Sequence, residues 1–521
     1  MASSTFNRRT FFRRMLQISA LSSSAVAFPA RNSDAASRAE RVSDTKLSAL
    51  GWRELASSLQ GSLVLPSTPG YATRSLLYNS RFADLKPAAI AYCQGSNDVA
   101  TCLAFAAKHD LLFTSRSGGH SYGGYSSSPG LVIDVSRLAA IDVDAKAMTA
   151  KIGAGARLID VYDTLNQHDF ALPGGTCATV GIAGSTMGGG VGVLARKFGL
   201  TCDHLIGSRL VTASGERIVA SADHHPDLLW ALKGGGGGNF AIATSFEFEL
   251  NPMPPTTLFT LHYPWSEAPA VLEGWQHWIG SRPDELWSNC QLFSQGTAGF
   301  LVQVNGVFCG SEAELTPHLT SLRSMVGSPS STFVGGDAYL EAMKIEAGCS
   351  RLSIVACHLA GDAPGGLLGH EAYAAKSSYV NTPDTRGRTS EWVHAVERLA
   401  SAAPYVGGGL SFDSYGGAIN RVANDATAFV HRDKLAGVQA AYSWGNRSAG
   451  SEIAAGERWL RWLGSEVFDE SAGAYQNYID PTLVNWQDAY YGSNLERLIR
   501  VKNSYDPKNR FFFAQSIPLR R

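Results

Sequence analysis

Glycine clustering is the feature of this sequence that most restricts what the chain can fold into. Glycine accounts for 54 of the 521 residues, above its average share of ~7%. Much of it falls into three stretches, which we call loop 1 (residues 116–124), loop 2 (173–192) and loop 3 (234–239). Glycine adopts backbone conformations that other residues avoid and lets the backbone approach a bound group closely. We therefore expect three loops that lie against a ligand and are held by ordinary strands and helices.

Loop 1 has an unusual residue at its centre. It reads Arg116-Ser117-Gly118-Gly119-His120-Ser121-Tyr122-Gly123-Gly124 and follows a predicted strand at residues 112–114. Bare backbone N–H groups in such a loop can surround a diphosphate. The spacing fits neither a G-x-x-x-x-G-K-[ST] phosphate loop nor a G-x-G-x-x-G dinucleotide loop, so ATP and a Rossmann-bound nicotinamide are not indicated. A glycine loop alone is usually a tight turn, and the central histidine is what sets this one apart.

Composition limits the class of protein. Hydrophobic residues make up 45% and charged residues 17% of the chain, which is typical of a globular protein. Lys plus Arg is 44 and Asp plus Glu is 45, so the basic excess expected of a nucleic-acid binder is missing. After the N-terminus, no stretch of about 20 residues lacks charged or turn residues, and we predict no membrane span. The length suggests two or three domains of about 100–200 residues each.

The N-terminus, residues 1–45, is interpreted as an export signal followed by a polar linker. Arg8-Arg9 and Phe11-Phe12 precede a mildly apolar run from Met15 to Ala30. A basic segment, an apolar segment and small residues together form an export signal. The paired arginines resemble a twin-arginine signal, which would export the folded protein to the periplasm or the medium. The alternative is a basic, disordered tail, because four serines interrupt the apolar run.

The eight cysteines predict no metal centre. None forms Cys-x-x-Cys, and no Cys/His cluster has zinc spacing. If the chain is exported, some cysteines can pair, and Cys93 with Cys102 is one possibility. Most are expected to be small, buried apolar residues.

Apolar and helical patterns divide the chain into parts that differ in composition and in the order of strands and helices. Up to residue 250, short apolar strands alternate with helical stretches, for example a helix at 96–109 and strands at 131–135 and 240–250. Residues 255–465 have fewer glycine clusters and most of the tryptophans, and strands are predicted at 299–304 and 353–356. We interpret this central part as an α+β domain with a mostly antiparallel sheet that forms a substrate chamber over the first domain.

Several motifs in a fixed order carry a family resemblance. Loop 2 contains Pro173-Gly174-Gly175-Thr176-Cys177-Ala178-Thr179-Val180-Gly181, and the C-terminal part contains Tyr475-Gln476-Asn477-Tyr478 and Tyr505-Asp506-Pro507-Lys508-Asn509. Together with loops 1 and 3, they resemble the FAD-linked oxidases of the vanillyl-alcohol oxidase and para-cresol methylhydroxylase (PCMH) superfamily. Within it, the chain is most similar to the berberine-bridge-enzyme branch. The resemblance is strong over residues 84–253 and 470–521 and weak between them.

The resemblance implies a division of the chain into domains. It places a two-part, PCMH-type FAD-binding domain at residues 46–253 and an α+β substrate-binding domain at 254–465. Residues 466–521 would be a C-terminal segment that returns to the FAD-binding domain. The fold expected is therefore α+β.

The resemblance also implies FAD with two covalent attachments. The histidine of loop 1, His120, would bond to the flavin 8α-methyl carbon, and Cys177 of loop 2 would bond to ring carbon 6. The plainer alternative is a hydrogen-bonded loop histidine and a buried thiol. Further residues expected to contact the cofactor are Arg116, Ser117, Gly118, Gly119, Ser121, Thr179, Val180, Gly181, Gly184, Gly188, Gly190, Gly238, Asn239, Ile242 and Asn509.

A proton acceptor must lie within hydrogen-bond reach of the substrate hydroxyl. The family resemblance assigns this role to the first tyrosine of Tyr-x-Asn-Tyr, here Tyr475, with Tyr478 as the next candidate. If this segment is a regular strand, Tyr475 and Tyr478 lie on opposite faces, and only a kink lets both face the substrate. Gln439 would orient the substrate, because an amide is not a base. Many relatives have a tyrosine after the triple glycine where this chain has Val191, so a phenol that often supports the base is absent.

Two further hypotheses concern oxygen and the substrate. The resemblance places Val180 near the flavin face that oxygen uses, where valine is typical of oxygen-permissive members; alternatively, Val180 simply packs. Trp265, Trp275, Trp278 and Trp287 suggest a sugar-binding platform. Trp275 and Trp278 are three residues apart on a predicted helix, a spacing more typical of core residues.

These patterns lead to one favoured function and two alternatives. We expect an exported oxidase that moves a hydride from an alcohol or hemiacetal carbon of a sugar or secondary metabolite to FAD, with O2 as acceptor and hydrogen peroxide as product. Its partners are then a small-molecule substrate and O2. A flavin dehydrogenase with another acceptor and a non-catalytic, flavin-carrying binding protein are the alternatives.

Overall fold

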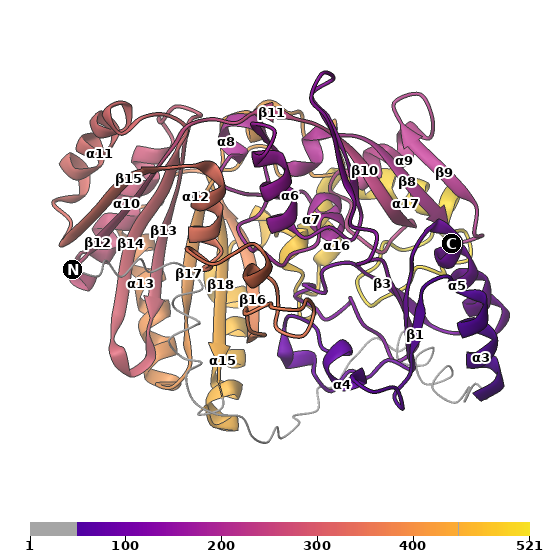
Figure 1. Ribbon diagram of the computed structural model, residues 1–521. Coiled ribbons are helices and arrows are strands. Elements are labelled where there is room, and N and C mark those ends of the chain that lie inside the picture. Colours follow the sequence, from indigo (N-terminus) through magenta and orange to yellow (C-terminus); the bar gives the residue numbers. More distant parts are fainter. Residues whose placement is uncertain (1–48, 446–447, 521) are drawn as a thin grey trace.

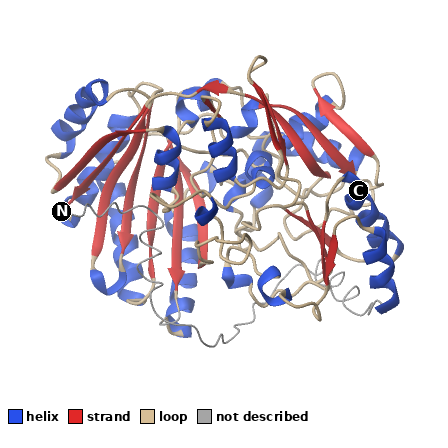
Figure 2. Cartoon of the chain, in the orientation of Figure 1, coloured by secondary structure: helices blue, strands red, loops and turns tan. Residues whose placement is uncertain are grey.

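The computed structural model of the chain describes residues 49–445 and 448–520 (Figure 1). Helices and strands are mixed throughout, and the α+β class predicted from the sequence is confirmed (Figure 2). The predicted export signal lies outside the described residues and stays a prediction. Among the described residues, no helix combines the length and the apolar character that crossing a membrane requires.

The first sheet positions loop 1. It has four strands in the order β1-β2-β4-β3, with β2, β4 and β3 parallel and β1 antiparallel. Helix α5 (Ser96–Lys108) packs against it with Cys102 and Leu103 buried. Loop 1 leaves the carboxyl end of β3. The strands are β1 (Ser62–Val64), β2 (Ala89–Tyr92), β3 (Phe113–Arg116) and β4 (Leu131–Asp134).

A second sheet carries the elements on either side of loops 2 and 3. Its five strands are antiparallel, in the order β5-β6-β10-β8-β9. Loop 3 connects helix α9 (Pro226–Leu232) to β10, and loop 2 contains helix α7 (Ile182–Met187). The strands are β5 (Ile141–Asp144), β6 (Thr149–Gly153), β8 (Leu205–Thr212), β9 (Arg217–Ser221) and β10 (Ala241–Glu249).

The central part of the chain forms a seven-stranded sheet in which every neighbouring pair is antiparallel. The predicted antiparallel sheet is therefore confirmed. It lies beside the first two sheets, on the left in Figure 1. The strand order is β15-β12-β14-β13-β17-β18-β16. The strands are β12 (Thr256–Tyr263), β13 (Leu286–Ser294), β14 (Phe300–Phe308), β15 (Ser331–Asp337), β16 (Ala372–Val380), β17 (Gly407–Ser414) and β18 (Ala436–Trp444).

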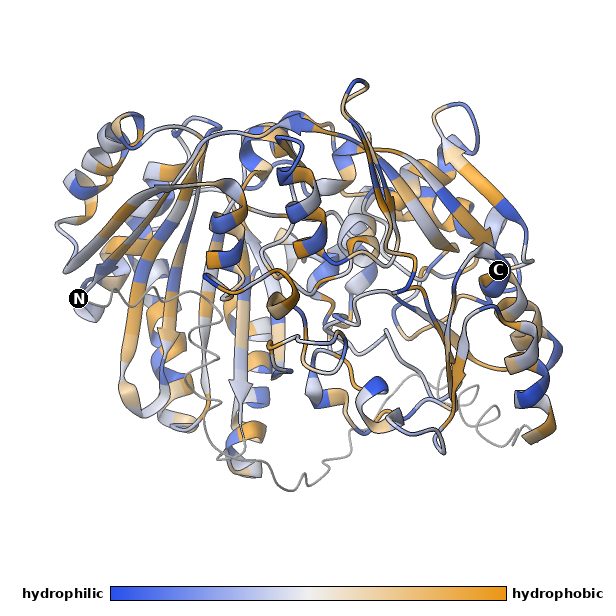
Figure 3. Cartoon of the chain, viewed as in Figure 1, coloured by the Kyte–Doolittle hydropathy of each residue, from blue (hydrophilic) through white to orange (hydrophobic). Residues whose placement is uncertain are grey.

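The two faces of this sheet differ in chemistry because apolar and polar residues alternate along its strands. Figure 3 shows this alternation in the hydropathy of the chain. The apolar face, with Cys290, Leu292 and Phe412, packs against helices α10 (Ala268–Ile279), α13 (Arg386–Ala402) and α15 (Gly450–Trp462). The opposite face is polar although it is buried. We call these residues the polar wall: Asn289, Gln291, Gln303, Asn305, Ser411, Asp413 and Gln439.

One predicted strand of the central part is wrong. Residues 353–356 lie in a loop and enter the short 3-10 helix Val355–Cys357. A disulfide between Cys349 and Cys357 closes this loop, so the apolar run lies in a covalently closed loop and not in a strand. The suggested disulfide between Cys93 and Cys102 is also wrong, since both are free thiols buried in the hydrophobic core of the part that holds the first two sheets.

The C-terminal segment packs back onto the first part of the chain. Helix α17 (Leu495–Tyr505) carries Lys502, whose fully buried Nζ donates to Asn239 O, to Asp506 and to Phe511 O at 2.6–2.8 Å. A buried ammonium group is stable only with such partners. This contact fixes the end of the chain against loop 3.

Candidate active site

The three glycine loops, the polar wall and the C-terminal segment surround one cavity of about 330 Å³. This volume lies in the range of small-molecule sites, which is about 300–1,000 Å³. Most of the residues proposed from the sequence line it. They are Arg116, Ser117, Gly118, Gly119, His120, Ser121, Cys177, Val180, Gly181, Gly184, Gly238, Ile242, Gln439, Tyr475 and Tyr478.

Five predicted cofactor residues do not line the cavity: Thr179, Gly188, Gly190, Asn239 and Asn509. Asn239 holds loop 3, because its side chain donates to Gly235 O and Gly236 O and accepts from Ile517 N at 2.9–3.2 Å. Asn509 lies in the C-terminal turn with a φ of 49°.

Glycine is required where loops 1 and 2 touch. A Cβ on Gly118 would lie 2.1 Å from Gly181 N, which is far inside contact distance. A Cβ on Gly188 would lie 2.0 Å from Asn477 Oδ1. Loop 2 therefore meets the backbone of loop 1 at Gly118 and the Asn477 side chain of the C-terminal segment at Gly188, and these close approaches bring all three to one cavity wall.

His120 and Cys177, the two expected attachment residues, line the same cavity from loops 1 and 2. The imidazole of His120 exchanges a hydrogen bond through Nε2 with Thr179 Oγ1 at 2.8 Å. The ring of Tyr78 stacks on it, with centroids 4.0 Å apart and planes 15° apart. Cys177 is a free thiol of intermediate exposure, whereas the other free cysteines are buried.

Loop 1 also offers a buried cation. Arg116 Nε donates to Asp134 at 2.5 Å, and the guanidinium is almost fully buried. Its Nη1 has no hydrogen-bond partner among the described residues, although the side chain lines the cavity. A buried N–H group of this kind normally has an acceptor. The arrangement suits an anionic ligand such as a phosphate group beside loop 1.

The phenol oxygen of Tyr475 accepts three hydrogen bonds. The donors are Gly190 N at 3.0 Å, Val191 N at 3.3 Å and Asn477 Nδ2 at 3.0 Å. Burial raises the pKa of Tyr475 above its ordinary value, and the three donors act in the opposite direction. Two donors are backbone groups of the triple-glycine turn, so the turn assists Tyr475 directly although it carries Val191 in place of a tyrosine.

The segment that carries Tyr475 is not a strand. A 3-10 helix spans Gln476–Tyr478 and turns the chain, so the period-two argument does not apply. Tyr475 and Tyr478 therefore both line the cavity, with ring centroids 4.9 Å apart. From the sequence, only a kink lets both tyrosines face the substrate, and the structure contains such a kink.

Tyr122 of loop 1 is a cavity residue that sequence reasoning missed. Its ring stacks on Tyr478 with centroids 5.0 Å apart, and its hydroxyl accepts from Gln439 Nε2 at 2.9 Å. Gln439 thus connects the polar wall to loop 1. The position of Tyr122 directly after the glycine-histidine-serine run of loop 1 is the sequence signal that could have identified it.

The polar wall supplies the other side of the cavity. Asn289, Asp413 and Gln439 line it, and Asn289 lies opposite Asp413 in the pairing of β13 with β17. The remaining members pair with one another or with these residues through side chains on the same face of the sheet: Gln303 with Gln291 at 2.7 Å, Asn305 with Asn289 at 3.1 Å and Ser411 with Asp413 at 3.1 Å. Such a surface can hold several hydroxyl groups at once.

The proposed tryptophan platform is wrong for most of its members. Trp275 and Trp278 have no exposed surface and lie in the helix-covered core. Trp265 stacks on Phe300 away from the cavity. Only Trp287 lines the cavity, and its Nε1–H has no hydrogen-bond partner among the described residues.

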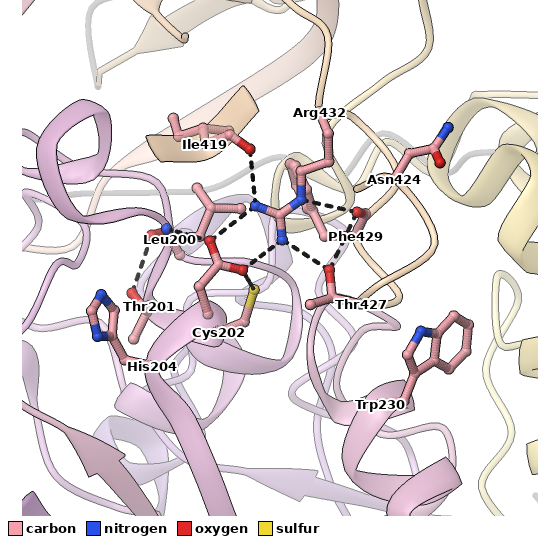
Figure 4. A network of polar contacts seen from close by, with 12 residues as sticks. Leu200, Thr201, Cys202, His204, Trp230, Ile419, Asn424, Thr427, Phe429 and Arg432 are labelled. Carbon is pink, nitrogen blue, oxygen red and sulfur yellow. Dashed lines mark hydrogen bonds and ion pairs between the residues drawn. The ribbon is translucent and has the colours of Figure 1, made fainter. Parts of the chain in front are cut away.

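A buried ion pair fixes the loop that packs against Tyr475. Arg432 donates to both carboxylate oxygens of Asp203 at 2.6 and 2.9 Å and lies at the centre of the network in Figure 4. The same guanidinium donates to Phe429 O and to Thr427 Oγ1. The ring of Phe429 in turn meets Tyr475 edge to face. The network therefore joins the segment that precedes β18 to the turn that follows loop 2.

Comparison with known proteins identifies the relatives of this chain. Residues 87–221 match the FAD binding domain family, and residues 474–518 match the berberine and berberine-like family. The FAD-linked oxidoreductase YgaK of Bacillus subtilis is 34% identical over 89% of this chain and 98% of its own length. Chitooligosaccharide oxidase of Gibberella zeae is 30% identical over 84% of this chain and 89% of its own length.

Solved structures give the same grouping. Physcomitrella patens BBE-like 1 is 28% identical and aligns over 90% of this chain and 99% of its own, with a TM-score of 0.80. Glucooligosaccharide oxidase of Acremonium strictum is 26% identical over 90% of this chain and 98% of its own, with a TM-score of 0.78. That enzyme carries a 6-S-cysteinyl, 8α-N1-histidyl FAD.

The residues present fit an FAD molecule. Loops 1 and 2 pack backbone against backbone at Gly118 to form one cavity wall, and the Nη1 of Arg116, which has no hydrogen-bond partner among the described residues, suits a phosphate. A histidine and a free cysteine, the two residue types that such linkages use, line the same cavity. Within the described residues, no group of three or more His, Cys, Asp and Glu side chains could hold a metal ion.

Proposed function

Because the chain belongs to the berberine-bridge-enzyme-like family of FAD-linked oxidoreductases, we propose that it oxidises a carbinol or hemiacetal carbon of a sugar, with FAD attached through both His120 and Cys177. When bound, FAD supplies an acceptor that takes a hydride from the carbon and passes two electrons to O2, which gives hydrogen peroxide. The observation that carries the proposal is that Tyr475 lines the cavity and that its phenol oxygen accepts three hydrogen bonds.

Tyr475 removes the proton from the substrate hydroxyl as the hydride leaves its carbon. A phenol is a weak base at its reference pKa of ~10 and needs donors to stabilise the phenolate. Gly190 N, Val191 N and Asn477 Nδ2 supply them. Asn477 also donates to Ser185 O at 2.9 Å, which holds the amide in place on helix α7.

The polar wall supports a sugar over a mainly apolar secondary metabolite. Asn289, Asp413 and Gln439 present amide and carboxylate groups toward the cavity, and such groups bind vicinal hydroxyls with donors and acceptors together. Tyr122 and Tyr478 provide stacked aromatic surface beside them. Two of the relatives are oxidases of oligosaccharides, which agrees with this choice.

We also propose that the protein is exported by its paired arginines. The Cys349–Cys357 disulfide supports this, because disulfides persist in oxidising compartments and are rare in the cytosol. Replacement of Arg8 and Arg9 by lysine should retain folded protein in the cytoplasm. Normal export of that variant would remove the proposal.

Hydrogen peroxide release is the test of the activity. Purified protein should release peroxide with one or more oligosaccharides in a panel of oligosaccharides, monosaccharides and simple alcohols, and the product should be a lactone or its acid. Reduction of an artificial dye without peroxide would indicate a dehydrogenase. Anaerobic protein that keeps oxidised flavin with every substrate would indicate a binding protein.

A further inference from the structure

The imidazole of His120 has two neighbours that fix its position. Nε2 exchanges a 2.8 Å hydrogen bond with the hydroxyl of Thr179, whose side chain is buried and does not line the cavity. Tyr78 covers one face of the ring at a centroid distance of 4.0 Å. The stacked ring of Tyr78 therefore holds one face of the imidazole and the hydrogen bond holds its Nε2 edge, while His120 itself lines the cavity.

The protonation state of one imidazole nitrogen determines whether the other has a free lone pair. In neutral histidine one nitrogen carries the proton and the other offers a lone pair, and the partner of the first selects the tautomer. A threonine hydroxyl can accept from N–H and can also donate to a bare nitrogen. Thr179 can therefore serve His120 both before and after a bond forms at Nδ1.

We propose that Thr179 is a positioning residue for flavin attachment: its hydroxyl holds His120 as the Nε2–H tautomer, so that Nδ1 presents its lone pair to the flavin 8α carbon. The inference rests on the proposed attachment through His120. Thr179 is two residues after Cys177, so the turn that carries one attachment residue also orients the other.

The attachment step balances as follows in atoms and electrons. The 8α-methyl carbon loses one C–H proton, Nδ1 of His120 forms a bond to that carbon, and two electrons remain on the flavin ring. The Nε2–H proton then leaves through the hydroxyl of Thr179. Molecular oxygen takes the two electrons and two protons as hydrogen peroxide, which restores the oxidised flavin.

The test separates the two attachments. Protein produced under riboflavin starvation is loaded with FAD in air, and the flavin that stays with acid-precipitated protein is followed over time. In a Cys177→Ala background, where only His120 can bond, Thr179→Val should slow attachment about 10–100-fold, the loss expected for a hydrogen bond to a group that becomes charged. Thr179→Ser should restore the rate, and non-covalent FAD binding should be unchanged in both.

Two control experiments distinguish a specific role of Thr179 from a general structural effect of the substitution. In a His120→Ala background, where only Cys177 can bond, Thr179→Val should leave the attachment rate unchanged. Thr186→Val removes a buried hydroxyl of helix α7 that has no hydrogen-bond partner among the described residues, and it should also have no effect. If Thr179→Val does not fold, Thr179→Ala serves in its place.

Each outcome decides the inference. Attachment at the parental rate in Thr179→Val, or equal slowing of both tethers, overturns the role of Thr179 while the double linkage stands. If Cys177→Ala protein carries no covalent flavin at all, the linkage through His120 is wrong and the role of Thr179 falls with it. Peptide mass spectrometry identifies the residue that carries the flavin in every arm.

Discussion

Removal of the Tyr475 hydroxyl should separate proton transfer from the rest of the reaction. Tyr475→Phe keeps the ring, and with it the edge-to-face contacts to Phe429 and Tyr478. Loss of a general base costs about 10²–10⁴-fold in rate, which corresponds to about 3–5 kcal/mol of activation free energy. The loss should appear in anaerobic reduction of the flavin by substrate. Reoxidation by O2 needs no base at this position and should be unchanged.

The same substitution should have a measurable cost in stability. It leaves Gly190 N, Val191 N and Asn477 Nδ2 without the acceptor they share, at 3.0–3.3 Å in the wild-type protein. An unsatisfied buried donor costs about 1–3 kcal/mol. Asn477 keeps its second bond to Ser185 O, so the loss falls on the two backbone donors, and the free energy of unfolding should decrease by an amount within that range.

Stopped-flow spectroscopy under nitrogen measures the reduction rate, and urea denaturation measures the stability. Tyr442→Phe is a suitable control, because Tyr442 is fully buried in the helix-covered core and its hydroxyl has no hydrogen-bond partner in the described part of the chain. It should leave flavin reduction unchanged. If Tyr475→Phe reduces its flavin as fast as the wild type, the proton acceptor is another group, and Tyr478 is the next to test.

Three further predictions follow from the cavity and its supports. Because burial raises the pKa of Tyr475 above its ordinary ~10, the rate of flavin reduction should rise about tenfold per pH unit between about pH 6 and about pH 9, and Tyr475→Phe should lose this slope. Val180→Leu adds one methylene group to the cavity wall, so flavin reoxidation by O2 should slow while anaerobic reduction stays nearly unchanged; an unchanged oxygen rate would return Val180 to a packing role. Arg432→Met leaves Asp203 buried without its partner and should lower the free energy of unfolding by about 3–5 kcal/mol in urea denaturation, and adding Asp203→Asn should recover part of the loss.

Much of the glycine-loop half could be predicted because its signals are local. The strands at residues 131–135 and 240–250 and the helix at 96–109 appear in the structure as β4, β10 and α5, within a residue or two at each end. Arg116, His120 and Ser121 lie in one unbroken motif, so their meeting at one cavity wall needs no long-range information. The order of the motifs along the chain then indicated the family.

Two of the sequence patterns mislead because they assume a regular backbone that the chain does not have. A regular strand would place Tyr475 and Tyr478 on opposite faces, but the short 3-10 helix at Gln476–Tyr478 supplies the kink that lets both line the cavity. Residues 353–356 have the composition of a strand, yet the Cys349–Cys357 disulfide closes them into a loop. Pairing of cysteines depends on distances that the sequence does not contain.

Except for Gln439, the polar wall was not predicted, although its pattern is visible in the sequence. Asn289 and Gln291 alternate with Cys290 and Leu292, which is the ordinary pattern of a strand with one solvated face. The sequence does not say that the polar face is covered by another part of the chain. Burial of both faces turns an apparently solvated surface into a binding wall, and only the packing of the loops against the sheet reveals it.

The alternation in the seven-stranded sheet has a consequence for how this protein can diverge. Side chains at positions such as 289, 413 and 439 contact the cavity, while their neighbours 290, 412 and 438 hold the helices. Selection can therefore exchange the cavity residues Asn289 of β13 and Asp413 of β17 without disturbing the helix-covered core, whereas Gln439 of β18 also holds Tyr122 of loop 1. A combinatorial library restricted to those alternate positions is a direct route to new substrate ranges on an unchanged catalytic apparatus.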